Sequence, residues 1–130
     1  SLAVRWLKNN PCQFAFVYMH NTDRTGHSEG WMSDKYLRAI ANADACIGEV
    51  MRVLNGNTAV IVMSDHGGHD KTHHSDLPED ITIPFIIRAP GIPAGERIRG
   101  EVCITDVAPT IADLLGLAAP ESWVGARIAV

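Results

Sequence analysis

Val60-Ile61-Val62-Met63-Ser64-Asp65-His66-Gly67-Gly68-His69 joins an apolar run to a cluster of possible metal ligands. The apolar run predicts a strand, and the glycines after the Asp-His pair predict a loop. His73 and His74 follow shortly, so four of the six histidines lie in this region. In α/β proteins, sites form at the carboxyl ends of strands. The stretch therefore predicts an α/β fold with a functional site in this loop.

The rest of the chain alternates between predicted helices and strands. Phe14–Met19 is a continuous apolar run, which is typical of a strand buried on both faces. Ser33-Asp34 can cap a long amphipathic helix that Asn55-Gly56 would close. With the strand expected over Thr58–Ser64, this order predicts a parallel strand-helix-strand crossover. Further elements are expected at residues 2–7 (helix), 81–88 (strand), 102–104 (a brief apolar run) and 106–115 (helix).

Bulk composition limits the class of protein. A length of 130 residues is enough for one compact domain, and 46% hydrophobic with 20% charged residues indicates a globular chain. A net charge of -4 without a Lys/Arg cluster does not favour nucleic-acid binding. No apolar run approaches the roughly 20 residues that span a bilayer. The three cysteines lack CxxC spacing and are predicted to be small buried side chains, and no feature indicates a compartment.

A second polar loop, after the strand predicted at Phe14–Met19, carries Asp23 and His27. In a parallel sheet it would open at the same edge as the loop that carries Asp65 and His66. Carboxylate oxygens with imidazole nitrogens suit Zn²⁺, and also Mn²⁺ or iron. Two such sets could hold two ions about 3.5–4 Å apart, the spacing that clamps the attacking and leaving oxygens at phosphorus. The pattern predicts a metal centre.

Two other histidine motifs fail on their context. His69-Asp70-Lys71-Thr72-His73 has the histidine spacing of a zinc protease, but it lacks the Glu base and follows two glycines, where no helix is expected. The pair His69-Asp70 resembles that of HD-type phosphohydrolases, which are helical proteins, whereas this chain alternates strands with helices. Neither motif is adopted.

The ordered motifs resemble those of the alkaline phosphatase superfamily, and most closely its nucleotide pyrophosphatase/phosphodiesterase-like (sulfatase-like) branch. The resemblance covers almost the whole chain. It implies an α/β fold in which the chain forms part of a mostly parallel sheet flanked by helices. The motifs that carry it are Thr22–His27 with Gly30-Trp31, Ser64–Gly68, Thr72-His73, Pro78–Asp80, Ile83–Phe85, Ala89–Ile92 and Thr105–Thr110.

The resemblance also implies ligand roles. Asp23, His27 and His73 would hold one divalent ion, and Asp65 with His66 would hold part of a second. Zn²⁺ is the cofactor expected, with Mn²⁺ as the alternative. His69 and His74 have no fixed ligand role in the family.

One departure from the family pattern affects catalysis. The family places a further metal-binding Asp and a Ser or Thr nucleophile ahead of everything seen in this chain. The resemblance therefore implies that residues 1–130 are a single domain, the carboxyl-terminal portion of a larger catalytic domain. Its partner would be the missing N-terminal half, and the nucleophile is expected upstream of Ser1, so no catalytic residue is assigned within the chain.

Three functions remain open. The leading hypothesis is a fragment of a metal-dependent hydrolase of small phosphate esters, of phosphodiesterase or phosphatase type, which would be inactive alone. The second is a non-catalytic metal-binding module or truncated homologue. The third is a sulfatase or phosphoglycerate-mutase relative. Sulfatases favour Ca²⁺ with oxygen-rich ligands, against which His27 and His73 argue, whereas mutases favour Mn²⁺.

Overall fold

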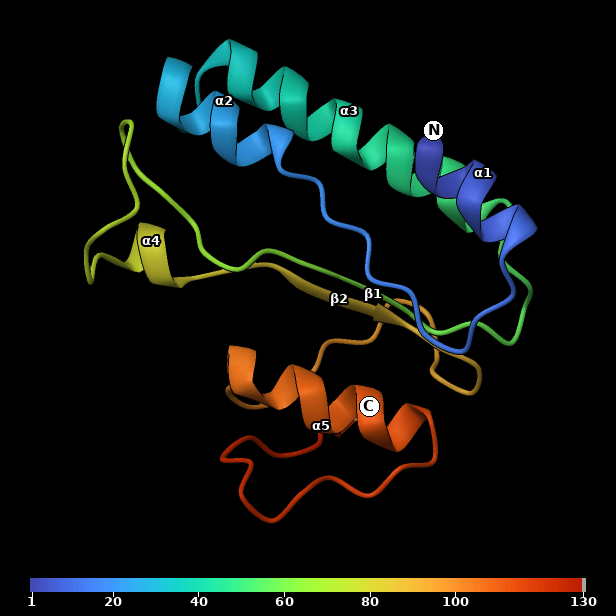
Figure 1. Ribbon diagram of the computed structural model, residues 1–130. Coiled ribbons are helices and arrows are strands. Elements are labelled where there is room, and N and C mark those ends of the chain that lie inside the picture. Colours follow the sequence, from blue (N-terminus) through green and yellow to red (C-terminus); the bar gives the residue numbers. More distant parts are fainter. Residues whose placement is uncertain (130) are drawn as a thin grey trace. The chain divides into compact units, whose positions relative to one another are not determined.

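A computed structural model describes residues 1–129 of the chain (Figure 1). These residues form two compact units. The first comprises Ser1–Gly56 and Val62–Phe85, and the second comprises Asn57–Ile61 and the chain from Ile86 onward. The elements are α1 (Leu2–Asn9), α2 (Asn21–Glu29), α3 (Asp34–Met51), β1 (Val60–Met63), α4 (Pro78–Ile81), β2 (Phe85–Arg88), the 3₁₀ turn η1 (Ile104–Asp106) and α5 (Val107–Leu114).

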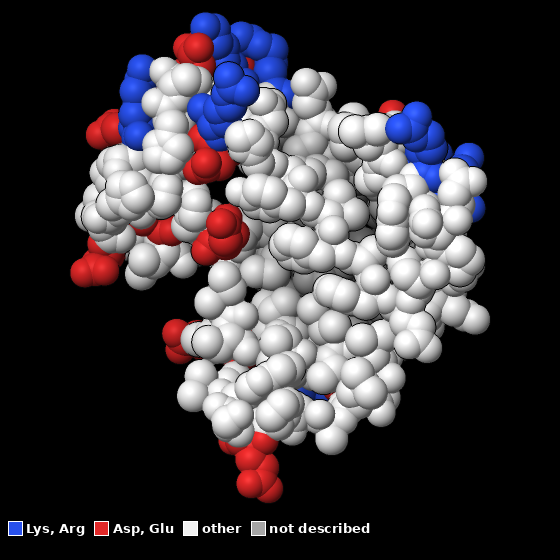
Figure 2. All heavy atoms as spheres, in the orientation of Figure 1, with Lys and Arg blue, Asp and Glu red and all other residues white. Residues whose placement is uncertain are grey.

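In the first unit, α1 and α2 both contact the long helix α3 (Figure 1). Ser33 caps α3 as predicted, because its Oγ accepts a hydrogen bond from the Tyr36 N–H at 3.2 Å. Ala39 is the buried residue of α3. Figure 2 shows basic and acidic side chains interspersed over these helices. A salt bridge of 2.9 Å between Lys35 and Glu29 joins α3 to α2.

The second unit is organised by Asp106 and Thr110 at the start of α5. The Asp106 carboxylate accepts hydrogen bonds from the Cys103 N–H at 2.9 Å and the Ala126 N–H at 2.8 Å. The Thr110 hydroxyl, which is buried, accepts from the Ile128 N–H at 3.0 Å. The bonds from Ala126 and Ile128 hold the tail against the start of α5, and they give two backbone N–H groups of the tail their partners.

The α/β character is confirmed, but the sheet differs from the prediction. In the described part of the chain β1 pairs with β2 in a two-stranded antiparallel sheet, so a mostly parallel sheet is not confirmed. Phe14–Met19 is not a strand, and burial on both faces was wrong, because Phe16 is 81% exposed and Tyr18 66% exposed. A strand of this kind needs neighbours on both sides, and the two-stranded sheet is made by other residues.

Several boundaries also moved. The segment with Asp23 and His27 is the helix α2 and not a loop. The strand predicted at residues 81–88 begins only at Phe85, because Pro78 starts the short helix α4 and Pro84 lacks the N–H that a ladder needs. Cys12 and Cys103 are exposed, so their predicted burial was wrong. Among the described residues no helix has the length and apolar character needed to cross a membrane.

Candidate metal centre

The first predicted ligand pair lies on a single helix. Asp23 is in the first turn of α2 and His27 in its last turn, four residues later, so both project from the same face. The Asp23 Oδ1 lies 3.4 Å from the His27 Nε2. The helix stops at Gly30, whose φ of 94° favours glycine. The helical conformation therefore creates a pair that the sequence had suggested only as a loop motif.

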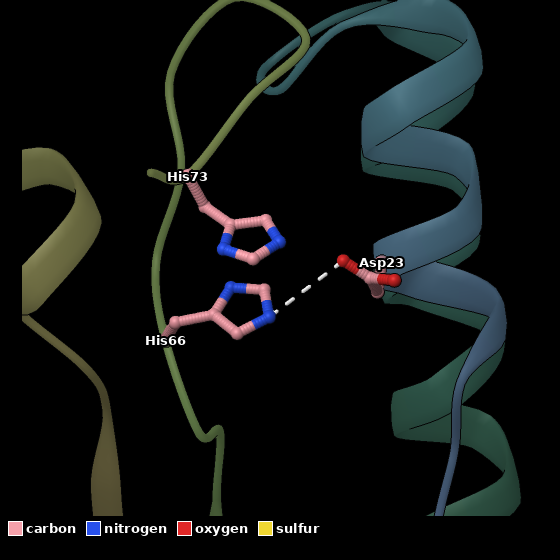
Figure 3. Close-up of side chains that lie close together, drawn as sticks. All are labelled: Asp23, His66 and His73. Atoms are coloured by element: carbon pink, nitrogen blue, oxygen red, sulfur yellow. Dashed lines mark ion pairs between the residues drawn. The ribbon is translucent and has the colours of Figure 1, made fainter. Parts of the chain in front are cut away.

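The second group of ligands lies on the loop that follows β1. Backbone hydrogen bonds between His69 and Thr72, at 3.0 and 2.9 Å, fold this loop into a narrow hairpin. The hairpin returns His73 to the side of His66, and their rings stack with centroids 3.7 Å apart and planes 13° apart (Figure 3). Two histidines seven positions apart are thereby placed as neighbours.

Asp23, His66 and His73 converge at one point. Each offers one ligand atom, and these atoms all lie within 4.8 Å of one another. Figure 3 shows the Asp23 carboxylate on its helix facing the two rings, with 3.7 Å between its Oδ1 and the His66 Nε2. The Oδ1 atom is buried and has no hydrogen-bond partner among the described residues. A buried acceptor normally has a partner, so this atom fits a bound cation.

The tautomers of His27 and His66 sharpen this point. The His27 Nδ1 donates to the Lys71 carbonyl at 3.0 Å, and the His66 Nδ1 donates to the Gly67 carbonyl at 2.8 Å. A carbonyl only accepts, so Nδ1 carries the proton, and in the neutral ring Nε2 keeps its lone pair. Both Nε2 atoms face the Asp23 Oδ1. In the neutral rings these nitrogens are hydrogen-bond acceptors, and the carboxylate oxygen is an acceptor as well. Only a proton or a metal ion between them makes this arrangement favourable, and backbone anchoring of the far nitrogen is usual for metal-binding histidines.

Trp31 fixes the two parts of the site to each other. Its ring meets His27 edge-on at 5.1 Å and His73 at 6.0 Å between centroids. A Cβ at Gly26 would lie 2.6 Å from the indole and a Cβ at Gly68 would lie 2.2 Å from it, so only glycine permits this packing. The backbone N–H of Trp31 also donates to the Asp70 carbonyl at 2.7 Å. This tryptophan, which the sequence offered only as part of a motif, joins α2 to the histidine hairpin.

Burial and histidine neighbours act together on His73. Burial lowers the pKa of its imidazole, and the neighbouring rings of His66, His74 and His27 lower it further. Because the charged ring is disfavoured, His73 keeps a neutral nitrogen, which is the form that binds a metal.

The remaining predicted residues lie at the edge of this group. The Asp65 side chain is 66% exposed, and its Oδ1 lies 3.8 Å from the His66 Nε2. The His27 ring lies 5.0 Å from that of His73. The closest set thus combines Asp23 and His73 from one predicted ion site with His66 from the other. The division of the ligands between two ions stays a prediction.

His69 and Asp80 form a pair beside this group that sequence reasoning missed. The His69 Nδ1 lies 2.7 Å from the Asp80 Oδ1. This bond raises the pKa of His69, and the nearby Asp70 and Glu79 act in the same direction. Burial raises the pKa of Asp80, but hydrogen bonds from His69 and Ser75 outweigh it and the pKa is lowered overall. Sequence analysis had identified Pro78–Asp80 as a family motif, but the motif does not indicate which residue Asp80 contacts.

The pair gives a prediction for stability against pH. The raised His69 pKa stabilises the fold below about pH 6.5, and this contribution is lost as pH rises through the folded pKa. The lowered Asp80 pKa stabilises the fold above about pH 3.9, and this contribution is lost as pH falls through the folded pKa. We expect the stabilisation to be largest between these values.

His69→Asn tests this, because the Asn amide can donate to Asp80 but does not titrate. Urea unfolding of the metal-free chain should show wild type losing stability relative to this variant as the pH rises from the ordinary histidine pKa of about 6.5 through the raised pKa of folded His69. A difference that stays constant over this range would contradict the prediction.

Comparison with known proteins places the chain in a family. The family model described as "Metalloenzyme superfamily" matches residues 2–119. The chain belongs to the metalloenzyme superfamily, the alkaline-phosphatase-like group that its motifs resemble. Divalent metal binding is a property that this family implies.

Curated relatives are longer enzymes. A 2,3-bisphosphoglycerate-independent phosphoglycerate mutase of Acaryochloris marina is 29% identical over 124 residues, which cover 83% of this chain and 22% of the relative. The enzyme of the same name from Staphylococcus haemolyticus is 32% identical over 115 residues, which cover 81% of this chain and 21% of the relative. The chain therefore spans about a fifth of the length of these relatives.

Proposed function

We propose that this chain is the metal-binding portion of a metal-dependent phosphoryl-transfer enzyme, of the phosphoglycerate-mutase type. The supporting observation is that the Nε2 atoms of His27 and His66 face the buried Asp23 Oδ1, which has no hydrogen-bond partner among the described residues, an arrangement that a divalent cation would make favourable. The mutase relatives favour this alternative over the phosphodiesterase of the leading hypothesis.

The ligand set suits two divalent ions. Asp23, His27 and His73 would surround one ion, and Asp65 with His66 would form part of the other site. Mixed oxygen and nitrogen donors accommodate Mn²⁺ and Zn²⁺ alike. Because sequence reasoning expects Mn²⁺ for a mutase relative, the proposed mutase type puts Mn²⁺ ahead of Zn²⁺.

Each side chain has a role in preparing the site. When bound, the metal neutralises charge on the phosphoryl oxygens and lowers the pKa of the attacking group. His27 and His66 have Nδ1 fixed by backbone carbonyls, so that Nε2 is directed at Asp23 before any ligand arrives. Trp31 holds α2 and the hairpin together, so the ligands need little rearrangement. We assign no nucleophile within the chain.

Metal titration of the chain tests the proposal. Purified chain stripped with a chelator should bind Mn²⁺ and Zn²⁺ with saturable stoichiometry in isothermal titration calorimetry. The Trp31 fluorescence should change in step, because two of the ligand rings touch its indole. Trp6→Phe and Trp123→Phe provide the matched background, since both side chains are exposed. Failure to bind either ion would overturn the proposal, and the histidine-carboxylate contacts would then be satisfied by protons.

An activity assay tests the missing nucleophile. The metal-loaded chain is expected to show neither phosphoglycerate mutase activity, assayed without added 2,3-bisphosphoglycerate, nor turnover of a nitrophenyl phosphate ester. Turnover of the ester that a chelator abolishes would contradict the absence of a nucleophile and restore the hydrolase hypothesis.

A further inference from the structure

We propose that Asp80 is a positioning residue that sets the distance between His66 and His73 in the metal centre; this inference rests on the proposed function. Asp80 lies on α4 and is 3% exposed, which makes it the most buried carboxylate of the described chain. Within the described part of the chain, its carboxylate hydrogen-bonds to His69 and Ser75 and not to His66 or His73. It acts through the hairpin that carries both of them.

The Asp80 carboxylate holds the body and the exit of the hairpin. Its Oδ1 accepts from the His69 Nδ1 at 2.7 Å. Its Oδ2 accepts from the Ser75 N–H at 3.0 Å and from the Ser75 hydroxyl at 2.7 Å. A buried carboxylate with several donors is stabilised, because each bond offsets part of the cost of removing the charge from water. One side chain thus joins two points of the hairpin that are six residues apart.

The backbone of α4 holds the entrance of the same hairpin. The Asp80 carbonyl accepts from the Gly67 N–H at 2.7 Å, and the Glu79 carbonyl accepts from the Gly68 N–H at 2.7 Å. A Cβ at Gly67 would lie 2.0 Å from the Glu79 carbonyl oxygen, so this approach requires glycine. Entrance, body and exit are therefore fixed to one helical turn.

The two ligand histidines lie at the border of the segment that this turn fixes and within it. His66 directly precedes Gly67, and His73 lies two residues before Ser75. Their rings stack at 3.7 Å although neither ring contacts α4 in the hydrogen bonds described above. Restricting both ends of a short loop removes conformational freedom that metal binding would otherwise have to overcome. Asp80 thereby keeps the two nitrogen donors in place before an ion is bound.

The hydrogen bonds favour a carboxylate at this position. The Ser75 N–H and hydroxyl and the His69 Nδ1 all donate to the Asp80 carboxylate, and the negative charge strengthens each bond. Asp80→Asn keeps the shape and the helix but removes this charge. The NH₂ group of the Asn would then meet either the Ser75 donors or the His69 Nδ1, which must give up its proton to accept. Glu79→Gln is the matched control, because the Glu79 side chain is exposed on the same turn.

Metal affinity and ring geometry are the two readouts. Asp80→Asn is expected to weaken Zn²⁺ and Mn²⁺ binding by roughly 10–100-fold, the loss typical of outer partners of a metal site. Glu79→Gln should bind as wild type does. In the metal-free chain, NMR signals of the His66 and His73 rings should move in Asp80→Asn toward unstacked values, with far-UV circular dichroism unchanged. This second readout needs no metal, so it separates failure of this proposal from failure of metal binding.

A pair of His69 variants keeps the test valid if Asp80→Asn does not fold. His69→Asn retains a donor at the position of Nδ1 and should keep near wild-type affinity, whereas His69→Ala should lose affinity as Asp80→Asn does. Equal losses in both variants would show that His69 is itself a ligand and would overturn the positioning role. A folded Asp80→Asn chain with wild-type affinity and unshifted ring signals would also overturn it.

Discussion

Asp23→Asn is expected to abolish tight metal binding while leaving the metal-free chain at least as stable as wild type. The carboxylate is the anionic ligand of the closest group, so its loss should exceed the roughly 10–100-fold typical of outer partners. In the metal-free chain the Asn NH₂ could donate to a histidine Nε2 where the Asp23 Oδ1 has no hydrogen-bond partner among the described residues. One new hydrogen bond contributes about 0.5–1.5 kcal/mol.

Two measurements check these opposite effects. Calorimetric titration with Mn²⁺ and Zn²⁺ gives the affinity, and thermal unfolding in excess chelator gives the stability. Asp44→Asn is the control, because Asp44 is exposed on α3 and its substitution removes the same charge. Asp23→Asn with wild-type affinity would mean that Asp23 is not a ligand. A large loss of metal-free stability would mean that the wild-type carboxylate is satisfied by protonated histidines.

Gly67→Ala is expected to destabilise the chain by about 1–3 kcal/mol, the usual cost of forcing an extra carbon into a packed site. The added Cβ would meet the Glu79 carbonyl oxygen at 2.0 Å and the Thr82 carbonyl oxygen at 3.1 Å. Relief requires α4 to move, which breaks the hydrogen bond of 2.7 Å from the Gly67 N–H to the Asp80 carbonyl. Metal affinity should fall as well, since His66 is the neighbouring residue.

Gly56→Ala is the matched control. A Cβ there has no atom within 4 Å and the residue has no positive φ, so Ala should be neutral or stabilising by up to about 1 kcal/mol. Urea unfolding of the three chains gives the free energies of unfolding directly. A Gly67→Ala chain as stable as Gly56→Ala would contradict the close approach of α4 to the histidine hairpin.

Sequence reasoning chose carboxylates and imidazoles because metal chemistry restricts ligand types strongly, and the ligand roles themselves stay a prediction. Asp23, His66 and His73 were chosen as carboxylate and imidazole donors, and these three lie closest together. The prediction for His73 over His74 came from the family resemblance alone. The helix that carries Asp23 and His27 could not be predicted from the local pattern, since Asp, Gly and His have weak helix propensity. Contact with α3 is available to stabilise this helix.

The residues that sequence analysis missed are those that hold the candidate ligands in place and have no metal-binding pattern of their own. Asp80 follows a proline in a short polar stretch, and its burial arises only when the hairpin folds over α4. Trp31 likewise gains its role from the nearby Gly26 together with the distant Gly68. Local patterns report which residues could bind a metal. They do not report which distant backbone groups will hold those residues in place.

The apolar segment Gln13–Met19 gives the chain a tendency to aggregate. Its seven residues include no charge, no proline and no glycine, and aromatic and β-branched side chains dominate. Such composition is the signature of segments that assemble into cross-β fibrils when they are left uncovered. Phe16 and Tyr18 are both uncovered here. A protein surface that covered this segment would therefore prevent its aggregation. It would in this way also preserve the metal centre.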